Sequence, residues 1–207
     1  MIVITEINKN NLIKIKSVLD NSGVIVFPTE TVWGLGCKYD DEKAVSRIYS
    51  IKGRNESNPL QIQVSGKNDF EIYSYVNNND CWNTISSQFL PGPLSVISKK
   101  KKNVPDFVTA NLDTVAFRYS SCNYLLDLID FLGYPIASTS CNLSGEQVIT
   151  DKVEIFQFSK KHADILIDID CGNGNISSTI ISLINNEIKL IREGLIKFDD
   201  IKKGLEK

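Results

Sequence analysis

The sequence contains a single histidine, His162, and five cysteines, none of which forms a CxxC pair. A zinc site needs cysteine and histidine ligands at characteristic spacings, so no metal site is predicted. The cysteine number is odd and nothing indicates an oxidising compartment, so we predict that all five thiols are free. The cysteines are Cys37, Cys81, Cys122, Cys141 and Cys171.

Long apolar runs and an excess of one charge are also missing. No stretch of about 18 apolar residues predicts a membrane span, and the N-terminus lacks the basic and apolar regions of a secretory signal. The sequence therefore predicts a cytoplasmic protein. The 23 basic and 25 acidic residues give a net charge of −2, so any anion site must be built locally.

Hydrophobic residues make up 42% of the 207 residues, which is enough for one buried core without disulfides or metals. Apolar periodicity predicts helices at 11–20, 41–50, 80–90 and 123–132, and strands at 24–27, 60–64, 94–97, 115–118, 135–138, 165–169, 179–184 and 187–192. Asn185-Asn186 predicts a tight hairpin between the last two strands, because asparagine tolerates positive φ. The pattern favours one α/β domain over residues 1–207, with a mixed sheet and no extra C-terminal domain.

Polar residues and glycines follow the first apolar strand, in the segment PTETVWGLG at 28–36. The carboxyl ends of strands in open α/β sheets form ligand crevices, so Thr29, Glu30 and Thr31 can orient a small polar substrate. Gly34 and Gly36 allow close backbone approach, although the same pattern is typical of a simple strand-to-loop turn. The sequence has neither a GxxxxGK[ST] nor a GxGxxG motif, so neither of these phosphate-binding loops is predicted.

Two further segments carry groups that bind anions. Lys52-Gly53-Arg54 combines a mobile point charge with a planar fork of donors, which suits a polyphosphate, but it is also typical of a solvated helix end. The segment STSCNLSG at 138–145 offers short hydrogen-bonding side chains that can cradle phosphate or ribose oxygens, or merely cap a turn. Arg118 at a strand end and Arg192 in the hairpin are weak signals by themselves.

Cys141 lies inside the second segment and suggests a cysteine nucleophile. Such a nucleophile needs a base, and His162 is the only histidine available, so this is the less favoured interpretation. The run Lys99–Lys102 has no interleaved aromatic residues, which favours a solvated turn over a nucleic-acid groove.

Taken in order, these segments resemble the threonylcarbamoyl-AMP synthase family, the YrdC-like domain. The resemblance runs from about residue 10 to 195 and rests on seven motifs in register. They are PTETVWGLG at 28–36, Lys52 and Arg54 with Asn58-Pro59-Leu60, Pro91–Ser95, Val115–Arg118, Ser140–Gly145, Ser178-Thr179 and Arg192-Glu193-Gly194.

The resemblance implies a twisted mixed sheet with flanking helices around a concave basic cavity. It implies an enzyme that condenses L-threonine, bicarbonate and ATP to threonylcarbamoyl-AMP and pyrophosphate, without a resident metal. A separate transferase complex then modifies the adenosine beside the tRNA anticodon. Lys52, Arg54, Ser140 and Asn142 correspond to a catalytic tetrad. The implied ATP contacts are Lys52, Arg54, Asn58, Thr114, Ser140, Val148 and Arg192, and the implied threonine contacts are Thr31, Gln63, Arg118, Ser138 and Ser178.

This sequence departs from the family pattern at several positions. Gln63 stands where many members have histidine, so a proton-transfer role cannot be carried over to it. At Val148, in a segment that replaces SPT, a nucleotide contact is available only from the backbone. Other replacements are Trp33 for tyrosine, Asn55 for proline, Ser95 for threonine and Cys141 for alanine.

The implied reaction needs cationic side chains, and the motifs supply them. Joining a carbamate to the α-phosphate of ATP brings two anions together, so charge neutralisation and positioning dominate the barrier. We expect Arg118 to hold the threonine carboxylate and Lys52 and Arg54 to neutralise the triphosphate, with Mg²⁺ arriving on ATP. The alternatives are a non-catalytic RNA-binding module, with tRNA contact through the same cavity, and a carbamoyl transferase for another acceptor.

Overall fold

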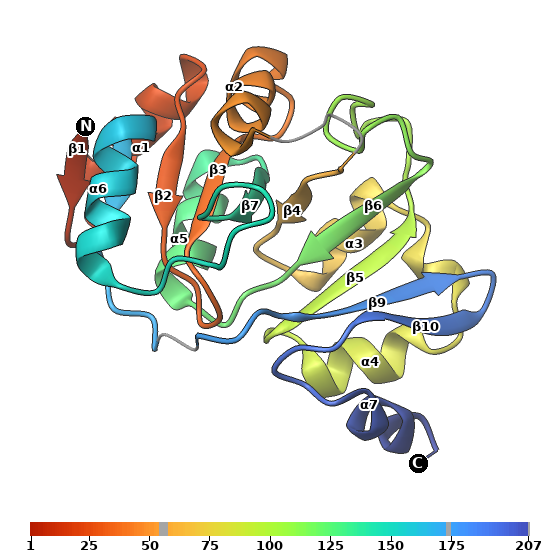
Figure 1. Cartoon of the computed structure of the whole chain (residues 1–207). Coiled ribbons are helices and arrows are strands. Elements are labelled where there is room, and N and C mark those ends of the chain that lie inside the picture. Colours follow the sequence, from red (N-terminus) through yellow and green to blue (C-terminus); the bar gives the residue numbers. More distant parts are fainter. Residues whose placement is uncertain (54–57, 173–174, 207) are drawn as a thin grey trace.

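The computed structural model describes residues 1–53, 58–172 and 175–206. Within them, one mixed sheet has the strand order β1-β8-β2-β3-β7-β4-β6-β5-β9-β10 (Figure 1). The strands are β1 (Ile2–Ile4), β2 (Ile25–Phe27), β3 (Gly34–Lys38), β4 (Gln61–Gln63), β5 (Leu94–Lys99), β6 (Thr114–Arg118), β7 (Ile136–Ser140), β8 (Ile165–Ile167), β9 (Thr179–Ile184) and β10 (Glu187–Arg192). The predicted mixed α/β sheet is confirmed.

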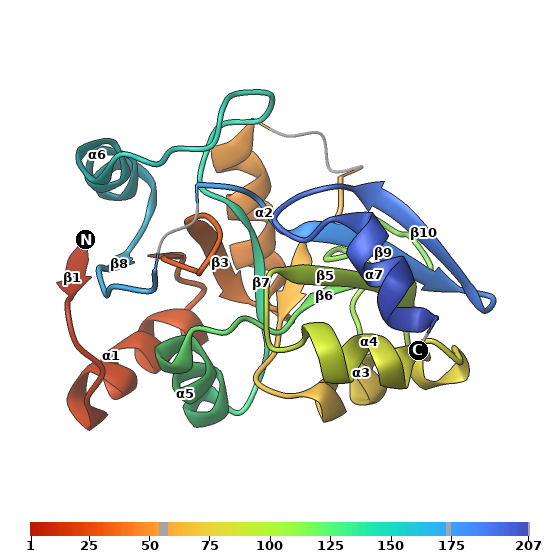
Figure 2. The ribbon, with the colours of Figure 1, turned by 90° about the horizontal axis from the view of Figure 1, so that it is seen from below.

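Helices cover both faces of the sheet. In Figure 2, α1 and α5 lie on one side of the N-terminal strands, while α2 and α6 lie on the other. The helices are α1 (Lys9–Asp20), α2 (Glu42–Lys52), α3 (Lys67–Tyr73), α4 (Trp82–Phe89), α5 (Asn123–Leu132), α6 (Lys152–His162) and α7 (Phe198–Leu205), with a 3-10 helix η1 (Val76–Asn78). No helix of the described residues combines the length and apolarity needed to cross a membrane.

Two apolar clusters hold these layers together. Ile15 of α1 and Leu125 of α5 pack with Phe27 of β2 in the smaller cluster. Phe70 of α3 and Phe117 of β6 belong to the larger cluster, and their ring centroids are 5.1 Å apart. Phe117 thus packs on the α3 face of β6, which leaves the side chains on the opposite face of this strand free to line a site.

Local signals determine several element ends, among them the predicted hairpin turn. Asp41 caps α2 by accepting a hydrogen bond from the Ala44 amide at 3.0 Å. Gly133 ends α5 with a φ of 75°, and Asn185 and Asn186 turn the hairpin with φ values of 56° and 57°. These positions need positive φ, which glycine and asparagine adopt most readily.

The segment 28–36 is only partly the loop that its glycines indicate. Gly34 and Gly36 belong to β3, which pairs with β2 and β7. A Cβ added at Gly34 would lie 2.7 Å from the Phe27 ring, and one at Gly36 would lie 2.7 Å from Ile136. Both glycines are therefore needed for close packing within the sheet. Gly34 also lines the cavity described below, so the expectation of a close backbone approach at this position stays a prediction.

The prediction of five free thiols is wrong for one pair. Cys122, which precedes α5, and Cys171, which follows β8, form a disulfide with their Cα atoms 5.8 Å apart. The two residues are 49 positions apart in the sequence, so spacing gave no sign that the fold brings them together. Cys37, Cys81 and Cys141 are free.

Candidate active site

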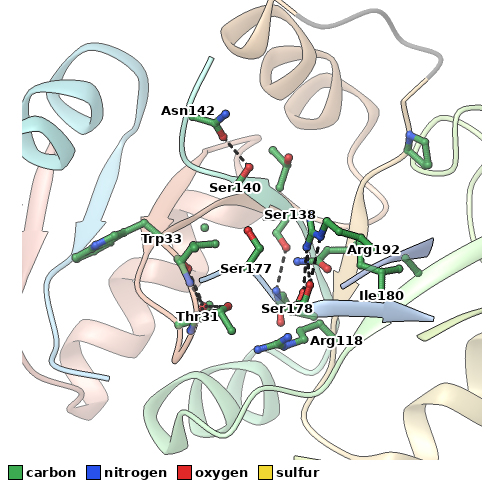
Figure 3. A pocket seen from close by; sticks show the side chains of 18 of the residues that line it. Thr31, Trp33, Arg118, Ser138, Ser140, Asn142, Ser177, Ser178, Ile180 and Arg192 are labelled. Atoms are coloured by element: carbon green, nitrogen blue, oxygen red, sulfur yellow. Dashed lines mark hydrogen bonds between the residues drawn. The ribbon is translucent and has the colours of Figure 1, made fainter. Parts of the chain in front are cut away.

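A cavity of about 390 Å³ opens over the central strands (Figure 3). Among its described lining residues three are cationic, Lys52, Arg118 and Arg192, and none is acidic. Such a lining attracts anions. The predicted site residues that line it are Thr31, Lys52, Gln63, Arg118, Ser138, Ser140, Asn142, Ser178 and Arg192.

Strand alternation explains why polar side chains gather on this face. Gln61 and Gln63 of β4 line the cavity, whereas Ile62 between them belongs to the hydrophobic core. In the parallel pairing of β4 with β6, Gln63 lies beside Arg118. The period of two and the register together bring residues from distant segments to one surface.

Lys52 organises the turn that follows β7. Its Nζ atom donates to the Ser140 carbonyl at 2.7 Å and to Asn142 Oδ1 at 2.9 Å. Ser140 Oγ donates to the same Oδ1 at 2.6 Å, a contact drawn in Figure 3. Three members of the predicted tetrad are thus in contact, and the fourth, Arg54, lies outside the described residues.

Two of the predicted threonine-side residues, Gln63 and Ser138, contact each other in the same cavity. Gln63 Nε2 donates to Ser138 Oγ at 3.2 Å, while Gln63 Oε1 is buried and has no partner among the described residues. Thr31 Oγ1 lies 2.9 Å from Thr29 Oγ1. A buried carbonyl oxygen without a donor is costly, so Gln63 is available to accept from a bound hydroxyl or ammonium group.

Arg118 is almost completely enclosed, with 2% of its side chain exposed, and it pairs with Glu30 at 2.8 Å. Burial by itself would raise the pKa of Glu30, but the Arg118 charge and the hydrogen bonds from Ser120 and Ser121 outweigh it and lower that pKa. Burial also lowers the pKa of Arg118, against the opposing effect of Glu30. The pair is ionic, and Glu30 is not among the described residues that line the cavity.

Arg192 closes the cavity from the hairpin side. Its Nη2 atom donates to the Ser178 carbonyl at 2.9 Å and to Ser178 Oγ at 3.3 Å. Ser178 Oγ lies 3.0 Å from Ser95 Oγ, which also donates to Gln61 Oε1 at 3.1 Å. Burial lowers the pKa of Arg192. This chain of contacts connects the C-terminal hairpin to the central strands.

Three residues predicted to contact a nucleotide are not among the described lining residues. Asn58 is exposed beside Pro59, which does line the cavity, while Thr114 and Val148 are half-buried. Thr114 lies opposite Lys99 at the far end of β6 from Arg118. Their assignment to ATP stays a prediction.

Sequence reasoning missed Gln61, which lines the cavity. The polar alternation of 60–64 was a usable signal for Gln61, because it marks one face of a strand. The sequence analysis also expected Glu30 to orient a substrate together with Thr29 and Thr31. In the structure Glu30 contacts Arg118 and is not among the described residues that line the cavity. Among the described residues, no three His, Cys, Asp or Glu side chains lie together as a metal site would require.

The structure gives no support to a cysteine–histidine pair. Cys141 is buried, and burial raises the pKa of its thiol to about 12 in spite of the Lys52 charge. His162 lies at the end of α6 with its ring 4.8 Å from that of Phe158, and it is not a described lining residue. A thiol of this kind is protonated at neutral pH and is a poor nucleophile.

We therefore expect Cys141 to resist alkylation. In native protein at pH 7.5, iodoacetamide should modify Cys141 about 100-fold more slowly than the partly exposed Cys81, because both access and thiolate fraction are low. Mass spectrometry of peptides taken during the reaction measures both rates. Equal rates for the two cysteines would contradict the burial described here.

The chain is similar to known proteins in sequence and in structure. The sequence model of the Sua5/YciO/YrdC family, described as telomere recombination, matches residues 17–194. A Methanocaldococcus jannaschii protein is 36% identical over 200 residues, which is 95% of this chain and 93% of that protein. The threonylcarbamoyl-AMP synthase of Buchnera aphidicola is 34% identical over 178 residues, covering 84% of this chain and 98% of its own.

A solved structure extends the likeness to three dimensions. The crystal structure of Pyrococcus abyssi Sua5 complexed with L-threonine superposes with a TM-score of 0.87 at 31% identity. The superposition covers 98% of this chain and 60% of the Pyrococcus chain. This chain therefore spans 60% of that longer relative.

Proposed function

This chain belongs to the Sua5/YciO/YrdC family, and on that premise we propose that it is a threonylcarbamoyl-AMP synthase. The substrates would be L-threonine, bicarbonate and ATP, and the products threonylcarbamoyl-AMP and pyrophosphate. The enzyme class would be nucleotidyl transfer, since an AMP group moves from pyrophosphate to a carbamate oxygen.

One observation carries the proposal. A single cavity combines three cationic side chains with a set of neutral hydrogen-bonding groups that suits a small hydroxylated amino acid. Lys52 and Arg118 come from different elements, α2 and β6, yet both line it. A site that had to bind only a polyphosphate would not need the buried amide of Gln63 and the hydroxyls of Ser138 and Ser178.

The proposed reaction has two steps whose atoms balance. The threonine amine adds to the carbon of bicarbonate, and loss of water leaves an N-carboxylate, the carbamate. A carbamate oxygen then attacks the α-phosphorus of ATP, the bond to the bridging oxygen breaks, and pyrophosphate leaves. Both partners of the second step are anions, so nearby cations lower its barrier by offsetting repulsion and by fixing the attack geometry.

We assign roles to the residues as the family resemblance implies them. Arg118 would bind the threonine carboxylate, with Thr31, Gln63, Ser138 and Ser178 around the hydroxyl and amine. Lys52, Ser140, Asn142 and Arg192 would face the nucleotide, with Arg54, Asn58, Thr114 and Val148 as its further contacts. Mg²⁺ would be held by the ATP phosphates and water.

Partners follow from the product. Threonylcarbamoyl-AMP is a mixed anhydride that hydrolyses readily, so a threonylcarbamoyl transferase acting on tRNA would have to take it up promptly. The alternatives, an RNA-binding module and a carbamoyl transferase for another acceptor, have less support. Neither needs a threonine-side pocket next to the cations.

Pyrophosphate release tests the proposal. Purified protein incubated with ATP, bicarbonate and L-threonine should release pyrophosphate, and omission of either threonine or bicarbonate should reduce the rate to background. Serine, valine and glycine serve as matched amino acids. Release that does not depend on threonine would contradict the assignment, and salt-sensitive RNA binding without turnover would favour the binding module.

A further inference from the structure

We propose that Glu30 is a positioning residue that holds Arg118 in the orientation needed to bind the substrate carboxylate. The inference rests on the proposed function, in which Arg118 binds threonine. It adds a residue that does not touch the substrate but controls the one that does.

Protein donors occupy both carboxylate oxygens of Glu30. Oε1 accepts from Arg118 Nη2 at 2.8 Å and from the Ser121 amide at 3.1 Å, and Oε2 accepts from Ser120 Oγ. The side chain is 13% exposed. A carboxylate bound in this way has little capacity left for a ligand, so its function must be exerted through its partners.

Arg118, in contrast to Glu30, has hydrogen-bonding atoms that no described residue contacts. Its Nη2 atom donates to Glu30, while Nε and Nη1 are buried without a hydrogen-bond partner among the described residues. Unpaired guanidinium donors in an enclosed place carry a large desolvation cost. Because Arg118 lines the cavity, a carboxylate bound there would satisfy a guanidinium donor that no described residue uses, and the contact with Glu30 determines how the guanidinium plane is oriented.

The segment that carries Glu30 is itself fixed on both sides. Thr29 Oγ1 donates to the Val32 carbonyl at 2.7 Å, and Tyr124 Oη from α5 donates to the Pro28 carbonyl. Ser120 Oγ, which donates to Glu30, also accepts from the Cys122 amide at 3.2 Å. Glu30 therefore acts as a rigid anchor, because its backbone and its carboxylate are both restrained.

The test compares L-threonine with L-threoninamide, which lacks the carboxylate charge, by calorimetry. Glu30→Gln keeps the shape of the side chain but removes the charge that orients Arg118. We expect the Kd for threonine to rise about tenfold and that for threoninamide to change less than twofold. The KM for ATP at saturating threonine should stay within twofold, which a general structural role would not predict.

Asp164→Asn provides the matched control. Asp164 pairs with Arg47 at 2.5 Å and accepts from the Val24 amide at 2.8 Å, and neither member of the pair is a described lining residue. Loss of this pair removes a carboxylate–arginine contact without affecting Arg118, so both Kd values should be unchanged. Glu30→Asp is the second variant: it keeps the charge, moves it back by one methylene, and should also weaken threonine binding selectively.

The outcomes separate this inference from the function on which it rests. Folded Glu30→Gln or Glu30→Asp protein that binds threonine within twofold of wild type would overturn the positioning role. Equal weakening of threonine and threoninamide would do the same. Wild-type protein that neither binds threonine nor releases pyrophosphate would overturn the proposed function, and the inference with it.

Discussion

Lys52→Met is expected to lower the kcat of threonine-dependent pyrophosphate release by at least about 100-fold, the usual loss when a preorganised electrostatic donor is removed. Lys52 is buried, lines the cavity and donates to both Ser140 and Asn142. Methionine keeps much of the aliphatic stem but removes the charge and both hydrogen bonds. Steady-state kinetics with all three substrates near saturation measure the loss directly.

A lysine outside the cavity gives the control. Lys16 Nζ also donates to a backbone carbonyl, that of Leu132, at 3.0 Å, and it pairs with Asp20. Lys16→Met therefore removes comparable contacts without affecting the anion site, and its kcat should stay within twofold. A Lys52→Met protein that folds and keeps kcat within threefold would remove Lys52 from the catalytic machinery.

Elements with strong local signals could be predicted, and elements whose cause is tertiary could not. The hairpin turn at Asn185-Asn186 and the Asp41 cap of α2 depend on one or two residues acting on their own backbone. Strand β3 does not: its glycines are explained only by the Phe27 ring and by Ile136, which pack against it in the folded sheet. Helices α3, α6 and α7 were not predicted.

Gly23 is a further glycine whose role depends on packing that the local sequence does not show. A glycine just after a helix usually takes a left-handed conformation, but here Ser22 takes that conformation with a φ of 60°. A Cβ at Gly23 would lie 2.3 Å from Val18 Cγ1, so this glycine is required by close contact and not by its φ. The position of the turn was readable from the sequence, and the reason for the glycine was not.

In the candidate site, too, some residues could be predicted from local motifs, whereas the long-range contacts between them could not. Motif order pointed to Lys52, Ser140 and Arg118, and the cavity brings them together. An arginine at a strand end is usually exposed, and nothing near Arg118 in the sequence indicates that it is buried. Its counter-ion, Glu30, is 88 positions away and reaches it only because β2, β7 and β6 are arranged as they are in the sheet.

That long-range pair leads to the largest expected effect on stability. Arg118→Met should lower the free energy of unfolding by about 3–5 kcal/mol, because it leaves the Glu30 carboxylate buried without its cation. Adding Glu30→Gln to the same chain should restore more than half of that loss, since the uncompensated charge is gone. Threonine binding should stay impaired in both variants. Urea unfolding of the four proteins in this cycle measures the coupling.

The Arg47–Asp164 pair provides a reference for the expected loss in the free energy of unfolding. Its side chains are 40% and 38% exposed, so Arg47→Met should cost about 1 kcal/mol or less. Arg118→Met that costs no more than Arg47→Met, or a double variant no more stable than Arg118→Met alone, would mean that the Glu30 carboxylate is not held as a buried charge. Burial therefore makes this ion pair matter for stability, because a buried charge that loses its partner cannot be stabilised by water.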